Sequence, residues 1–94
     1  MAKAKFWRPG KGQIYKSRDE IEQKLLDAGW SFEGHGMGIE DGKVASYDVG
    51  VIAGAIWLWV DMVPCSGGVR VTRVRELPAS PKQQAAADKA KALT

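Results

Sequence analysis

Cysteine and histidine are nearly absent from this chain, which contains one of each, Cys65 and His35. A single cysteine excludes an internal disulfide framework and favours a reducing compartment. A metal site needs several Cys, His or carboxylate ligands at characteristic spacings, and none occurs here. A Cys–His nucleophile needs both side chains within hydrogen-bond reach, but these two residues fall in different predicted elements. The sequence therefore predicts a protein that is not an enzyme and has no metal or other cofactor.

The chain also lacks an apolar run long enough to cross a membrane. Its most apolar stretch, residues 49–60, carries no charge, but a spanning helix needs about 20 apolar residues. Asp48 and Asp61 bracket this stretch, and Gly50 and Gly54 interrupt it. No apolar signal segment follows Met1. These absences predict a cytoplasmic protein with no membrane role.

Charge is small in total but unevenly distributed. The net charge is +3 over 94 residues, a length that predicts one domain. Residues 1–16 are basic without any acid, residues 17–64 hold most of the acids, and the chain is basic again from Cys65. This layout favours two patches of opposite sign. We divide the chain into a basic arm (residues 1–11), an α+β domain (12–77) and an Ala/Lys-rich tail (78–94).

The tail has little to bury, because its only large apolar residue is Leu93. Pro81 suits the first position of a helix that Ser80 would cap. We expect this segment to be a frayed helix or disordered, and dispensable for folding.

The stretch that organises the chain reads as a strand over residues 55–63, rich in Ile, Trp and Val. Alternation places aliphatic side chains on one face and Trp57, Trp59 and Asp61 on the other. Gly54 is expected to mark a bulge or bend. The aliphatic face is the predicted core.

One helix is predicted over residues 18–28. Ser17 and Glu20 form a capping box at its start. Ile21, Leu25 and Ala28 recur at helical spacing, and Gly29 suits the left-handed position after the helix.

Three glycines, Gly34, Gly36 and Gly38, share one face of the next predicted strand. Aromatic rings on a neighbouring strand can cover such glycines; the alternative is a flexible glycine loop. A phosphate-binding loop is disfavoured, because those motifs open a helix and this one precedes a turn. Asp41-Gly42 is a strong hairpin signal.

We therefore predict an α+β fold: a small antiparallel sheet of four to five strands with one helix packed on one face. The expected strands are residues 12–16, 30–39, 43–52, 55–63 and 69–76. The last of these interleaves apolar and basic residues, and its alternation slips near Thr72, which indicates a bulge.

The candidate binding residues combine aromatic and basic side chains. Indole rings beside arginines are the ingredients of a nucleic-acid stacking platform and also the residue types that anchor protein interfaces. The simpler alternative is that the two strand tryptophans are covered by the arm or by the glycine face. The candidate set is Trp57, Trp59, Arg70, Arg73, Arg75, Phe6, Trp7, Lys5 and Arg8.

Two functions remain open at this level. The first is a small protein-binding inhibitor or adaptor that acts on a nucleic-acid-handling complex, its acidic middle engaging basic grooves. The alternative is direct binding of single-stranded nucleic acid or RNA through the basic arm and the aromatic sheet face. A homo-oligomer is compatible with either function.

Overall fold

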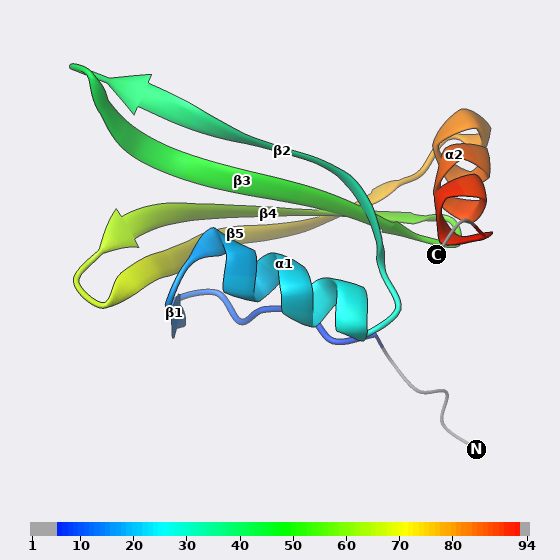
Figure 1. Ribbon diagram of the computed structural model, residues 1–94, viewed down its shortest axis with the longest axis horizontal. Helices are drawn as coiled ribbons and strands as arrows, with labels where there is room; N and C mark the ends of the chain where they lie inside the picture. Colours follow the sequence, from blue (N-terminus) through cyan, green and yellow to red (C-terminus); the bar gives the residue numbers. More distant parts are fainter. Residues whose placement is uncertain (1–5, 93–94) are drawn as a thin grey trace.

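The computed structural model describes residues 6–92. These residues form five strands and two helices, whose arrangement Figure 1 shows. In chain order they are β1 (Ile14–Tyr15), α1 (Arg18–Asp27), β2 (Ser31–Glu40), β3 (Lys43–Ala53), β4 (Ile56–Cys65), β5 (Gly68–Pro78) and α2 (Pro81–Ala92). All five predicted strands are present, and the bounds of the four long ones lie within two residues of those expected.

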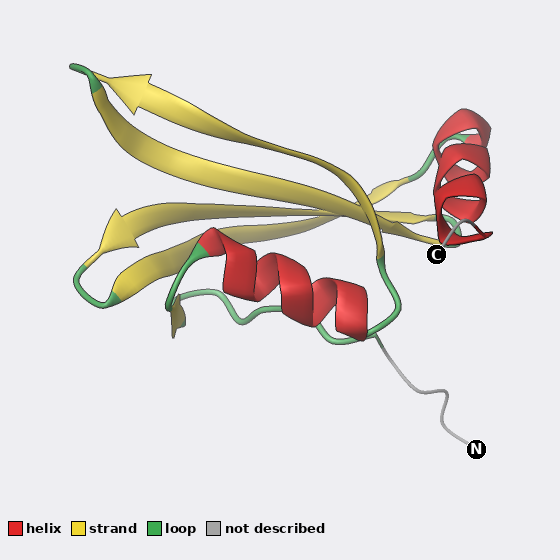
Figure 2. Ribbon diagram, in the orientation of Figure 1, coloured by secondary structure: helices red, strands yellow, loops and turns green. Residues whose placement is uncertain are grey.

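The strands form one antiparallel sheet in the order β1-β5-β4-β3-β2. The chain thus combines a five-stranded antiparallel sheet with two helices, where the sequence predicted one helix on the sheet and a frayed helix or disorder after Pro81. In Figure 2, α1 runs along one side of the sheet, and α2 stands at the end far from the β2–β3 and β4–β5 turns. No helix among residues 6–92 is long and apolar enough to cross a membrane.

Glycine turns set the meander of β2 to β5. Asp41 and Gly42 both have positive φ, 51° and 75°, as the predicted two-residue hairpin turn requires. Gly54, with φ 57°, lies in the turn between β3 and β4. The prediction of a bulge or bend at Gly54 was therefore incomplete, because the chain reverses there. The bulge predicted near Thr72 is present, since Asp61 pairs with Arg73 and Met62 with Val71.

Helix α1 has the predicted serine cap at its start and the predicted glycine after its end, but Glu20 reaches the amide of Lys16 and not the amide of Ser17 that a capping box uses. The Ser17 hydroxyl accepts from the Glu20 amide at 3.2 Å, and the Glu20 carboxylate accepts from the Lys16 amide at 2.7 Å. Gly29 has φ 106°, and the Trp30 amide donates to the Leu25 carbonyl, which closes the helix in a Schellman arrangement.

The core lies between α1 and the sheet. Ile21 and Leu25 are fully buried on α1, and Trp30 closes the core just after the helix. The sheet supplies the alternate residues of β3, β4 and β5 to the same cluster, which we call the core face: Val49, Val51, Leu58, Val60, Met62, Val69 and Val71. The predicted aliphatic face of β4 is therefore the core.

The sheet divides into two hairpins towards the turns at residues 41–42 and 66–67. β3 and β4 pair only between Tyr47↔Met62 and Ala53↔Ile56. Beyond Tyr47 and Met62, β3 pairs only with β2, and β4 only with β5. Figure 1 shows the two hairpins separating there.

Helix α2 is capped and packed. The Ser80 hydroxyl accepts from the Gln83 amide at 3.1 Å, while the Gln83 side chain accepts from the Ser80 amide at 2.8 Å. Ala87 is buried in a second cluster with Ile52 and Ala79, and Trp57 packs against it. The expectation that the tail has nothing to pack was wrong, because the end of the sheet offers an apolar surface that alanine side chains fit.

Candidate binding face

Strand alternation brings four of the predicted site residues together. Trp57 and Trp59 point away from the core face of β4. On the neighbouring strand β5, Arg75 pairs with Trp59 and Arg73 with Asp61. Because directly paired residues share one face of a sheet, tryptophans and arginines lie side by side opposite α1. We call Trp57, Trp59, Asp61, Arg73 and Arg75 the aromatic face.

Asp61 links an indole to an arginine within this face. Its carboxylate accepts a hydrogen bond from Trp59 Nε1 at 3.1 Å. Its other oxygen lies 3.6 Å from Nη2 of Arg75. The two indole rings contact edge to face, with centroids 5.7 Å apart and planes at 81°, an arrangement that aromatic pairs favour. One carboxylate therefore orients both an aromatic and a basic side chain.

Both tryptophans are half-buried, for different reasons. Trp57 packs against the cluster that includes α2, and its Nε1 is buried without an acceptor among the described residues. Trp59 lies on Gly50 of β3: a Cβ atom at position 50 would sit 2.6 Å from the ring atoms Cε3 and Cζ3. Both indole rings thus pack on the sheet, and part of each side chain remains exposed to solvent.

Aromatic cover of glycine occurs, but not where the sequence indicated it. The predicted glycines lie on β2, two strands away from Trp59 in the sheet order. Beside them are polar atoms of β3: Asp48 Oδ1 lies 3.1 Å from a Cβ position at Gly36, and Ser46 Oγ lies 2.6 Å from one at Gly38. Gly34 has open space around it. Gly50, which the sequence analysis did not single out, is the glycine that the indole covers.

Charge changes sign across this side of the sheet. The arginines lie on β5, at one side of the tryptophans. Acids lie on the other side: Asp48 on β3, and Glu33, which leans over Gly50 to within 2.8 Å of its Cβ position. Neither Glu33 nor Asp48 forms a hydrogen bond or ion pair within the described residues. The aromatic face is therefore flanked by positive charge on one side and negative charge on the other.

The N-terminal candidates lie elsewhere. Trp7 accepts a hydrogen bond from Trp30 Nε1 through its carbonyl at 3.0 Å, and Phe6 contacts the Trp30 ring with centroids 5.5 Å apart. Arg8 pairs with Glu76 and lies over Trp30. Lys5 is outside the described residues. Phe6, Trp7 and Arg8 therefore pack around Trp30 of the core and do not join the aromatic face.

Arg70 shares the side of the sheet but not the cluster. It pairs with Val63, towards the β4–β5 turn, five residues from Arg75. Consecutive strand residues rise about 3.3 Å each, which places Arg70 well away from the two indoles. Leu77, which pairs with Trp57 beside the aromatic face, was missed because the predicted strand ended at residue 76, whereas β5 continues to Pro78.

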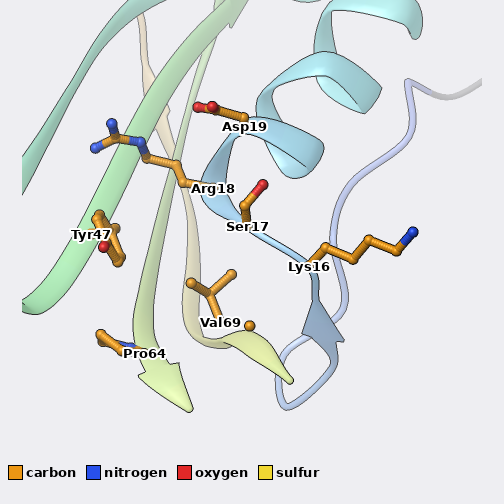
Figure 3. Close-up of a pocket in the computed structure, with 8 residues that line it drawn as sticks. Lys16, Ser17, Arg18, Asp19, Tyr47, Pro64 and Val69 are labelled. Carbon is orange, nitrogen blue, oxygen red and sulfur yellow. The ribbon is translucent and has the colours of Figure 1, made fainter. Parts of the chain in front are cut away.

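A pocket of about 290 Å³ lies where the two hairpins separate, beside the start of α1 (Figure 3). Arg18 is already engaged there: it donates to the Gly36 carbonyl at 2.9 Å and stacks over Tyr47. In Figure 3 the Lys16 side chain points away from Arg18. The two basic side chains at the pocket, Lys16 and Arg18, therefore do not converge.

The single histidine and cysteine are separated by the fold. His35, on β2, lies 3.3 Å from a Glu22 carboxylate oxygen on α1, whereas Cys65 ends β4 at the far hairpin. Among the described residues, no group of three or more His, Cys, Asp or Glu side chains is placed to hold a metal ion.

Comparison with protein-family models, with curated proteins and with solved structures found no match to this chain.

Proposed function

We propose that this protein is a non-enzymatic binding module whose aromatic face contacts a protein partner. The observation that carries the proposal is the Trp59–Asp61–Arg75 network, in which one carboxylate holds an indole and a guanidinium side by side on a partly exposed sheet surface. Tryptophan and arginine are the side chains that most often dominate interface energetics, particularly when their conformation is held before binding.

The mixture of charges favours protein over nucleic acid. A nucleic-acid backbone is uniformly negative, and its affinity for a protein rises with each phosphate that a cation neutralises. On this face Asp61 already pairs with Arg75, and Asp48 and Glu33 lie on the adjoining strands. A protein surface can match such alternation of sign, whereas a phosphate backbone would be repelled by the acidic half.

We further propose that the partner belongs to a complex that handles nucleic acid, which this protein inhibits or adapts. The acids of β2 and the β2–β3 turn, Glu33, Glu40 and Asp41, stand apart from the arginines of β5. Such an acidic region is complementary to a groove that normally binds phosphates.

A crosslinking experiment tests the proposal. A photoreactive side chain at position 73, which is exposed on the aromatic face, should capture one predominant protein in cells that produce this chain. The same group at Lys82, exposed at the start of α2, should not capture it. Arg75→Ala should weaken the capture at position 73. Equal capture from both positions would contradict the proposal.

Direct nucleic-acid binding is the second candidate, because Arg70, Arg73 and Arg75 all project from one side of β5. A mobility-shift series with single-stranded DNA and RNA over increasing salt separates the two functions. Phosphate binding should be strongest at low salt and fall steeply as salt rises. A shift with that salt dependence, lost in Arg73→Ala, would establish nucleic-acid binding in place of the protein contact. No shift at low salt would exclude it.

A further inference from the structure

The chain pairs one edge of its sheet with a further strand and leaves the other edge without one, although α2 contacts β2 there and Arg18 donates to the Gly36 carbonyl. Along β5, strand β1 pairs with the first residues, and the backbone of Gly12 and Gln13 bonds to Val71 at 2.7 and 3.0 Å. Arg8 then pairs with Glu76 further along the strand. The opposite edge is β2, a ten-residue strand whose only neighbour in the sheet is β3.

β2 lacks two of the residue types that normally protect an edge strand, and its pairing irregularities are confined to its ends. Proteins discourage pairing at such edges with lysine, proline or very short strands, and β2 contains neither lysine nor proline. Its side chains on the α1 side include Phe32, Met37 and Ile39, which are 41%, 52% and 56% exposed. Pairing irregularities occur at each end, and residues 34–38 pair regularly with β3 between them. This regular central part is the geometry that accepts a further strand.

We propose that β2 accepts an extended segment of a partner protein as a sixth strand, and that this segment alternates apolar and basic side chains. Its apolar side chains would cover Phe32, Met37 and Ile39 on the α1 side. Its basic side chains would lie on the opposite side, where Gly34 has open space around it and Asp48 and Ser46 of β3 lean over Gly36 and Gly38.

The basic character follows from the acids around this edge. Asp48 leans over Gly36, and Glu33 projects from β2 on the same side of the sheet. Both carboxylates are unpaired within the described residues. Lysine or arginine side chains of an added strand would reach them, and each such pair would select a basic segment over an acidic one.

A second copy of this chain fits the edge less well. Antiparallel pairing of two β2 strands would bring together two sets of the same acids, Glu33, Glu40 and Asp48, and β2 itself contains no lysine or arginine. The basic strand β5 of a second copy has its outer edge covered by its own N-terminal segment. The charges therefore favour a different protein as the source of the added strand.

This site adjoins the aromatic face, because Glu33 and Asp48 also form the negative side of that face, but its test follows the β2 backbone directly and does not depend on the proposed function. The probe is a blocked peptide of alternating lysine and valine, about nine residues long to match a full strand. It is titrated into the full-length protein while the backbone amides are followed by NMR. We expect the largest shifts and new protection from hydrogen exchange in residues 34–38. A peptide of alternating glutamate and valine should bind at least about tenfold more weakly.

Variants sharpen the result. Met37→Lys and the double variant Glu33→Gln, Asp48→Asn should each weaken binding of the lysine peptide. The matched control is Ile14→Lys, because Ile14 is also exposed (48%) on an edge strand, but at the other edge. Ile14→Lys should bind the lysine peptide as the unaltered protein does.

Three outcomes would overturn the inference. One is a lysine peptide that leaves the β2 amides unchanged, and another is equal binding of the two peptides. The third is a dimer in sedimentation experiments that Met37→Lys dissociates, since it would assign the edge to a second copy.

Discussion

The six-membered ring of Trp59 lies so close to Gly50 on the neighbouring strand that a side chain at position 50 has no room: its Cβ would meet the ring carbons at 2.6 Å. The pair stands at the middle of the β3–β4 ladder, so the packing of the aromatic face depends on the absence of a single methyl group.

Gly50→Ala should therefore destabilise the protein. The new methyl group would displace the indole and also the Glu33 carboxylate, which lies 2.8 Å from the same position. We expect a loss of about 1–3 kcal/mol in the free energy of unfolding, as for overpacked sites, measured by urea denaturation. Gly34→Ala is the control, because nothing lies within 4 Å of its Cβ position. An equal loss in both variants would show that strand glycines matter for reasons other than this contact.

Asp61 variants should separate its two contacts. Asp61→Asn keeps an oxygen that can accept from Trp59 Nε1 and removes only the partly exposed ion pair with Arg75, so we expect a loss of no more than about 1 kcal/mol. Asp61→Ala leaves the indole N–H without its acceptor and should cost about 1–3 kcal/mol. Thermal unfolding followed by tryptophan fluorescence measures both. A larger loss of stability in Asp61→Asn than in Asp61→Ala would mean that the ion pair, and not the indole hydrogen bond, holds the network.

Ala87→Asp should loosen α2 from the sheet. Ala87 is buried against the cluster of Ile52 and Ala79, and a carboxylate there would be desolvated without a partner. We expect a loss of about 1–3 kcal/mol, with increased exposure of Trp57 to an aqueous quencher. Ala86→Asp, at an exposed position of the same helix, is the control for helix propensity. If both variants have the melting temperature of the unaltered protein, the packing of α2 contributes nothing to stability.

Leu58→Ala should be among the most damaging single substitutions. Leu58 is fully buried at the centre of the core face, and such a truncation costs about 2–5 kcal/mol. Ile39→Ala removes a comparable side chain that is 56% exposed on β2, and it should change the free energy of unfolding by less than about 0.5 kcal/mol. Chemical denaturation of the two variants compares them directly, and similar losses would contradict the assignment of the core face.

Local signals were sufficient for the elements of this fold. Three of these signals act through the backbone of adjacent residues: the Ser17 cap, the glycine after α1 and the Asp41-Gly42 turn. Their structural effect can therefore be predicted from the sequence. The two-residue alternation of β4 likewise separates Leu58 from Trp57 and Trp59 whatever the partner strands are. Even the α2 cap at Ser80 follows from its neighbours along the chain.

Tertiary structure decided which of those local features meet. Only the register of β3 with β4 places Gly50, not the glycines of β2, beneath Trp59. Only the packing of the first residues around Trp30 removes Phe6 and Trp7 from the aromatic face. The docking of α2 depended on Ile52 and Trp57, which lie far from Ala87 in sequence. Such contacts join segments distant along the chain, and residue types alone do not specify which of several compatible surfaces will pack together, because burial is non-directional.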